Sequence, residues 1–128
     1  MSYYFSKTVQ TTFDDAVSRV TEELKKEGFG VLTEIDVKET LKKKMSVDFR
    51  KYRILGACNP QYAYKALEPE DKIGTMLPCN VIVQEIAGVG AEIAAIDPVA
   101  SMQAVKNPAL EEIAGQVRDK LRTVIARL

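Results

Sequence analysis

The sequence predicts an α+β fold in which a single, mainly antiparallel five-stranded sheet carries two main helices on one face. Residues 12–27 and 108–127 place apolar side chains at helical spacing, and these segments supply the two helices. The turn at 87–90 between two apolar stretches predicts a hairpin, where a parallel sheet needs a helical crossover. A doubly wound parallel sheet is therefore the weaker alternative. The 128 residues suffice for a single domain, 1–128, with its own core.

The first half of the chain predicts three strands and two helices. Alternating β-branched and aromatic residues indicate strands at 3–9, 31–37 and 52–58. Thr12 is the expected N-cap of the first helix, and Gly28 suits the left-handed position after its last turn. Asp36 is the expected cap of a second, short helix that runs to Met45.

The second half predicts a short helix, a loop, a hairpin and the long final helix. Asn59 and Pro60 begin the short helix as cap and first helical residue, and 68–78 is rich in charge, glycine and proline, which is typical of a loop. Strands at 79–86 and 91–96 form the hairpin. A short helical turn follows, and the final helix repeats apolar residues every three to four positions.

Composition excludes several classes of function. Lysine plus arginine equals aspartate plus glutamate at 18 each, and the resulting net charge of zero argues against nucleic acid or an anionic membrane as partner. The absence of histidine excludes a Ser-His-Asp triad and any imidazole metal site. The start of the chain has no signal-peptide pattern, and no apolar run is long enough to span a membrane. We therefore expect a cytoplasmic protein.

Three polar features favour structural interpretations. The glycine pair in 88–90 lies in a hairpin and lacks the lysine of a phosphate-binding loop, so it is read as a turn. The lysines at 42–44 are expected to form the solvated face of the short second helix. Glu34 and Asp36 could act as an acid–base pair, but two carboxylates on one strand more often belong to a wet sheet face and a helix cap.

The two cysteines give a more specific indication. Each is followed by asparagine, in Cys58-Asn59 and Cys79-Asn80. Cys58 is expected between a strand end and the start of a helix, where free N–H groups stabilise a thiolate. If the third and fourth strands are neighbours, the two thiols approach each other and could hold a soft metal ion or exchange with a disulfide. The competing interpretation is that both are small core residues.

The chain resembles the domain of unknown function 302 family through three stretches in the expected order. They are Val31-Leu32-Thr33-Glu34-Ile35-Asp36-Val37, Ile54-Leu55-Gly56-Ala57-Cys58-Asn59-Pro60 and Leu77-Pro78-Cys79-Asn80-Val81-Ile82-Val83. The resemblance covers roughly residues 3–100. It implies a TATA-binding-protein-like α+β fold, with the order β-α-β-β-β-β-α apart from small helices, in a bacterial or archaeal homodimer. It implies no activity, and the analogy carries no DNA binding over.

These observations lead to a ranked set of functional hypotheses. The first is a domain that is not an enzyme of a known class and that binds a small ligand or ion. Its candidate residues are Asp36, Cys58, Asn59, Cys79 and Asn80. The second hypothesis is a thiol-dependent enzyme or redox protein using Cys58. The third is a structural or interaction module with inert cysteines. The sequence does not identify a cofactor, and a metal is expected only if Cys58 and Cys79 act together.

Overall fold

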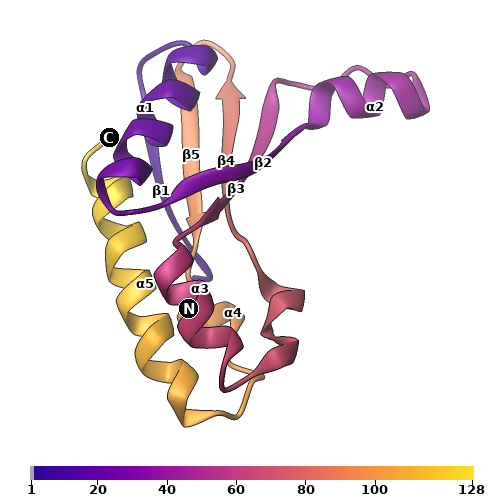
Figure 1. Cartoon of the computed structure of the whole chain (residues 1–128). Coiled ribbons are helices and arrows are strands. Elements are labelled where there is room, and N and C mark those ends of the chain that lie inside the picture. Colours follow the sequence, from indigo (N-terminus) through magenta and orange to yellow (C-terminus); the bar gives the residue numbers. More distant parts are fainter. Residues whose placement is uncertain (1) are drawn as a thin grey trace.

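The computed structural model describes residues 2–128 and contains one five-stranded sheet with helices on one of its faces (Figure 1). The strands are β1 (Tyr4–Val9), β2 (Gly30–Asp36), β3 (Tyr52–Cys58), β4 (Cys79–Ile86) and β5 (Gly90–Ile96). They lie in the order β1-β5-β4-β3-β2, and every neighbouring pair is antiparallel. The predicted α+β class is therefore confirmed, and the parallel alternative is wrong.

The helices begin at residues whose side chains or backbone suit a helix start. They are α1 (Phe13–Lys26), α2 (Val37–Met45), α3 (Pro60–Leu67), α4 (Pro98–Ser101) and α5 (Pro108–Ala126), with a 3₁₀ helix η1 (Asp71–Met76). Thr12 caps α1 by accepting a hydrogen bond of 3.1 Å from the Asp15 N–H, as predicted. Gly28 has a φ of 88°, which confirms the predicted left-handed turn after α1. Within residues 2–128, no helix combines the length and apolarity that crossing a bilayer requires.

The main core lies between the sheet and the two long helices. Val20 and Leu24 of α1 and Leu121 of α5 are fully buried against inward-facing strand residues such as Val81 and Ile93. Full burial of each such side chain contributes roughly 1.5–3 kcal/mol relative to leaving it exposed. The two amphipathic segments identified in the sequence thus cover one face of the sheet, as predicted.

A second, smaller apolar cluster lies beside the main core and corrects one expectation. Ala66, Ile73 and Leu110 are buried in it, with several partly buried neighbours around them. The segment 68–78, expected to be a loop, contains η1, and its Ile73 is only 1% exposed. Burial of this one apolar side chain against α3 and α5 orders a segment whose composition is otherwise typical of a loop.

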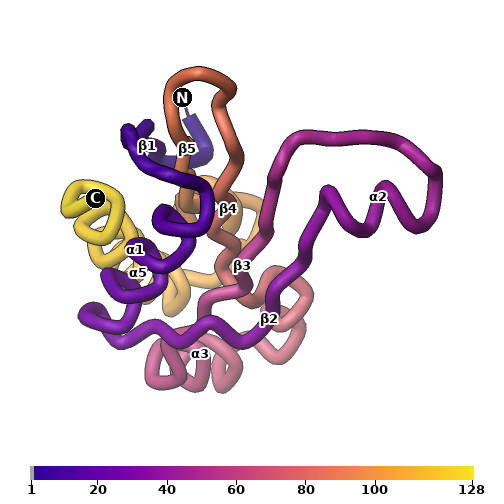
Figure 2. The backbone as a smooth tube through the Cα atoms, turned by 90° about the horizontal axis from the view of Figure 1, so that it is seen from above, coloured from indigo at the N-terminus to yellow at the C-terminus, as the bar shows by residue number. Residues whose placement is uncertain are grey.

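The opposite face of the sheet carries no helix, and we call it the open face. Figure 2 shows α1 and α5 together on one side of the strands, with α2 extending away on the other. Strand alternation and register place on the open face the side chains of Tyr4, Ser6, Thr8, Ile35, Tyr52, Ile54, Asn80, Ile82, Gln84, Glu92 and Ala94. Residues 37–51, which comprise α2 and the return to β3, are called the arm.

Candidate functional site

A small apolar pocket lies between the two hydrophobic clusters. Its walls come from the ends of β3 and β4 and from α3, α4 and α5, with a cavity volume of about 40 Å³. Because a water molecule needs about 10–15 Å³ by this measure, the cavity has room for a few atoms. The lining residues are Phe29, Ala57, Cys58, Asn59, Tyr62, Ala63, Ala66, Leu77, Pro78, Cys79, Pro98, Met102, Leu110, Ile113, Ala114 and Val117.

Both cysteines line the pocket, at the ends of two neighbouring strands. Cys58 ends β3 and Cys79 begins β4, and the register pairs Ala57 with Cys79 directly. The third and fourth strands are therefore neighbours, and Cys58 is close enough to Cys79 to act on it electrostatically. Cys79 is buried and Cys58 is half-buried, and both are free thiols.

Burial keeps the Cys79 sulfur uncharged. Removal from water raises the pKa of the Cys79 thiol to about 11, and the nearby Cys58 adds to the rise because two thiolates would repel. At neutral pH, Cys79 is therefore a neutral thiol. The pocket wall it forms behaves as an apolar surface with a weak hydrogen-bond donor rather than as an anionic site.

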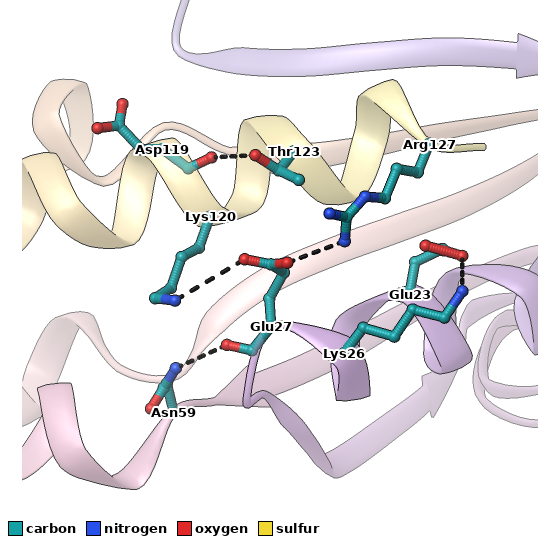
Figure 3. Close-up of polar contacts among 8 residues, drawn as sticks. All are labelled: Glu23, Lys26, Glu27, Asn59, Asp119, Lys120, Thr123 and Arg127. Carbon is teal, nitrogen blue, oxygen red and sulfur yellow. Dashed lines mark hydrogen bonds and ion pairs between the residues drawn. The ribbon is translucent and has the colours of Figure 1, made fainter.

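Asn59 fixes the turn between β3 and α3, but by a different contact from the one predicted. Its side chain makes no capping hydrogen bond to α3, although it holds the N-cap position before Pro60. Instead, Asn59 Nδ2 donates a hydrogen bond of 3.1 Å to the backbone oxygen of Glu27 at the end of α1 (Figure 3). Gly28 permits this approach, since a Cβ there would lie 3.0 Å from Asn59 Nδ2.

The Glu27 side chain joins this turn to the final helix. Its carboxylate accepts a hydrogen bond of 2.9 Å from Arg127 and lies 3.8 Å from Lys120 Nζ (Figure 3). Lys120 Nζ also lies 6.0 Å from the centre of the Tyr62 ring, which lines the pocket. Glu27 thus connects the end of α1 to the C-terminal segment through its carboxylate and to the turn before α3 through its backbone oxygen.

The structure separates two of the five predicted site residues from the cysteines. Asp36 pairs with Arg53 at one end of β2, whereas Cys58 pairs with Gly30 at the other end. Asp36 instead caps α2 through the Glu39 N–H at 2.9 Å, as its cap assignment predicted. Asn80 is exposed and points to the open face, because side chains alternate along β4 and Cys79 faces the helices. The candidate site retains Cys58, Asn59 and Cys79.

The polar features expected to be structural take those roles. Glu34 and Asp36 both lie near Arg53, at 3.1 and 3.7 Å, which makes them part of an ion-pair cluster. The lysines at 42–44 are exposed on α2. The two thiols are the only pair of metal-ligating groups in the pocket wall, and residues 2–128 contain no cluster of three or more Cys, Asp or Glu side chains arranged to hold a metal.

Much of the pocket wall was not anticipated as part of a site. Phe29, Tyr62, Ala63, Ala114 and Val117 line it, yet in the sequence they are ordinary apolar positions. The periodicity of α5 indicates only that Ala114 and Val117 face inward. Whether the inward face of α5 is closely packed or lines a cavity depends on how α3 and α4 pack against it. No local sequence pattern encodes that packing.

Comparisons with known proteins agree on one family. The family described as "Domain of unknown function DUF302" matches residues 5–128. A solved structure, the crystal structure of the uncharacterized conserved protein DUF302 from Bacillus stearothermophilus, is 33% identical with a TM-score of 0.91. The match covers 99% of this chain and 98% of that one. No curated protein matches. The chain therefore belongs to the DUF302 family of uncharacterised domains.

Proposed function

We propose that this domain binds a small, uncharged, apolar molecule, or the apolar end of a larger one, in the pocket beside Cys58 and Cys79. The observation that carries the proposal is the wall itself. All sixteen lining residues are apolar or aromatic except for the two thiols and Asn59. An apolar cavity with few polar groups is the common form of a small-molecule site.

The charge state of the wall favours a neutral ligand over an ion. Cys79, with a pKa of about 11, offers a thiol at neutral pH, and no charged residue lines the pocket. A charged ligand would lose its hydration without gaining an opposite charge, which is costly in an apolar site. A soft metal ion would first have to displace the proton that burial holds on Cys79.

A thiol-dependent reaction at Cys58 is the second candidate. Cys58 is half-buried in the pocket wall and directly precedes the turn into α3. The supporting observation is its position beside the buried Cys79, because a pair of close thiols can exchange with a disulfide. In this view the apolar pocket would bind the substrate next to Cys58.

Methyl-resolved NMR of the full chain tests ligand binding. We expect 1-butanol to shift the methyl signals of Ala57, Ala114 and Leu110, whereas butyrate of the same chain length leaves them unchanged. Ala63→Leu fills the pocket wall and should abolish the shifts. Ala109→Leu adds the same atoms to an exposed position on α5 outside the wall and should not. Equal shifts with butanol and butyrate, or none with butanol, would contradict the proposal.

A second measurement separates the two candidates. In the binding proposal, Cys58→Ser still shows the butanol shifts, because the cavity remains. In the thiol-reaction proposal, incubation with oxidised glutathione produces a mixed disulfide at Cys58 in the native protein. Absence of that adduct removes the second candidate and leaves the first intact.

A further inference from the structure

The far end of the arm is a continuous run of exposed residues, 42–48, which we call the tip. Figures 1 and 2 show α2 extending away from the sheet, with the chain turning back at the far end of the helix. No residue of α2 is buried, and within the tip Met45 and Val47 are 65% and 39% exposed. The arm thus projects from the body of the domain and presents two aliphatic side chains to solvent, directly after three lysines.

The neutral charge of the whole chain conceals an uneven distribution. The arm has six basic residues and two acidic ones, a net charge of +4, so the other residues carry −4 in total. The two acids, Glu39 and Asp48, pair with Lys43 and Lys42. Within residues 2–128, no carboxylate forms an ion pair with the four basic residues of the arm that remain, which are Lys38, Lys44, Arg50 and Lys51. A neutral composition therefore does not exclude an anionic partner for the arm itself.

The apolar residues of the arm distinguish between classes of anionic partner. Phe49 is its only aromatic residue, and the Arg50 guanidinium lies 4.4 Å from the centre of that ring. The arm therefore offers no free ring on which a nucleic-acid base could stack. The exposed side chains of Met45 and Val47 are instead aliphatic, and basic residues flank them. Basic and aliphatic side chains together suit the interface of a bilayer, where headgroups border the acyl chains.

We propose that the arm binds the surface of an anionic lipid bilayer. Met45 and Val47 enter the boundary between headgroups and acyl chains, and the lysines of the tip contact the headgroups. Four to eight basic residues in one short segment are typical of binding to anionic lipids. The nine residues of α2 are too few to cross a bilayer, so the contact is peripheral. No residue of the arm lines the apolar pocket, so this surface is separate from the proposed ligand site.

Sedimentation of the full chain with sucrose-loaded vesicles tests this contact. The protein should bind vesicles of equal parts phosphatidylglycerol and phosphatidylcholine, and should not bind pure phosphatidylcholine. Binding should weaken as the salt concentration rises from about 50 to about 500 mM, because salt screens the attraction between exposed charges. Lys44→Glu should lower the affinity at least about fivefold, since each basic residue near an anionic surface contributes to binding. Lys72→Glu makes the same change of charge on η1, outside the arm, and should lower it less than about twofold.

Fluorescence tests whether the tip enters the lipid. The chain has no tryptophan, so a single substitution gives an unambiguous signal. Emission of Val47→Trp should move to shorter wavelength when the anionic vesicles are added, because the indole leaves water. Leu67→Trp, at a similarly exposed position on α3, should show no shift.

Two competitors separate a bilayer from other anions. At matched ionic strength, excess glycerol phosphate should not displace the protein from the vesicles, and circular dichroism verifies that all variants are folded. Displacement by glycerol phosphate would show that the arm binds free phosphate groups rather than a membrane. That result would overturn the proposal. So would binding to a single-stranded oligonucleotide without binding to vesicles, or equal losses of affinity in Lys44→Glu and Lys72→Glu.

Discussion

Asn59 Nδ2 donates a hydrogen bond of 3.1 Å to the backbone oxygen of Glu27, which lies 32 residues earlier in the chain. This contact ties the turn that follows Cys58 to the end of α1, and α1 packs on the sheet. It therefore holds the part of the pocket wall formed by Asn59 against the main core.

Removal of this contact should destabilise the fold. In Asn59→Ala the Glu27 carbonyl loses its partner, and we expect the free energy of unfolding to fall by about 1–2 kcal/mol. Urea titration followed by circular dichroism measures the change. Asn80→Ala, at an exposed position on the open face, should stay within about 0.5 kcal/mol of wild type. Equal losses in both variants would show that the Asn59 bond makes no special contribution.

Leu121 should be among the most sensitive core positions. It is fully buried in the middle of α5 and packs in the main cluster. Leu121→Ala leaves a cavity and should lower the free energy of unfolding by about 2–5 kcal/mol. Leu32→Ala, which truncates a side chain that is 70% exposed, is the matched control and should cost less than about 0.5 kcal/mol. A loss below about 1 kcal/mol for Leu121→Ala would mean that the helix stripe does not face a packed core.

The Cys79 thiol should make stability depend on alkaline pH. Its pKa rises from an ordinary value near 9 to about 11 on folding, so the folded state holds the proton more tightly. The contribution is fully present below about pH 9 and is lost as the pH rises towards 11. The rise in the pKa of Cys79 from about 9 to about 11 corresponds to about 2–3 kcal/mol of folding stability. Denaturation midpoints measured from pH 8 to 11 should therefore fall more steeply for the wild type than for Cys79→Ala, and parallel curves would contradict this.

The two thiols should differ in reactivity in the native protein. At neutral pH, a thiol with a pKa of about 11 is ionised to about one part in ten thousand, and Cys79 is also buried. Half-buried Cys58 should therefore react with a disulfide reagent at least about tenfold faster. The variants Cys58→Ala and Cys79→Ala each keep one thiol. The rate at which each variant releases the coloured leaving group of an aromatic disulfide reagent gives the reactivity of that remaining thiol. Similar slow rates in both variants, rising only on unfolding, would identify both cysteines as packing residues.

The elements of the fold were accessible from the sequence because each has a local cause. The periodicity of α5, the Thr12 cap and the turn before β5 each depend on residues close together in the chain. The 3₁₀ helix η1 was missed because its order comes from burial of Ile73 against distant segments. Local patterns describe periodicity and caps, but not which loop acquires a tertiary partner.

The site was only partly accessible for the same reason. Cys58 and Cys79 could be brought together from the sequence only on the condition that the third and fourth strands are neighbours, which the structure meets. Asp36 was grouped with them because its stretch is similar to the family, yet it lies at the far end of β2. Asn59 holds its turn through a hydrogen bond to the backbone oxygen of Glu27, which lies 32 residues away in the chain. No rule of sequence spacing predicts this contact.

Xenon binding in a crystal tests directly whether the pocket beside Cys58 and Cys79 is a dry apolar cavity, because xenon enters such cavities and has no charge. We expect a xenon atom between Cys79, Ala114 and Leu110 in the wild type and in Ala109→Leu, and none there in Ala63→Leu. A pocket that instead holds ordered waters hydrogen-bonded to Cys79 and Asn59, with xenon bound only elsewhere, would contradict the proposal that it is a site for an uncharged apolar ligand.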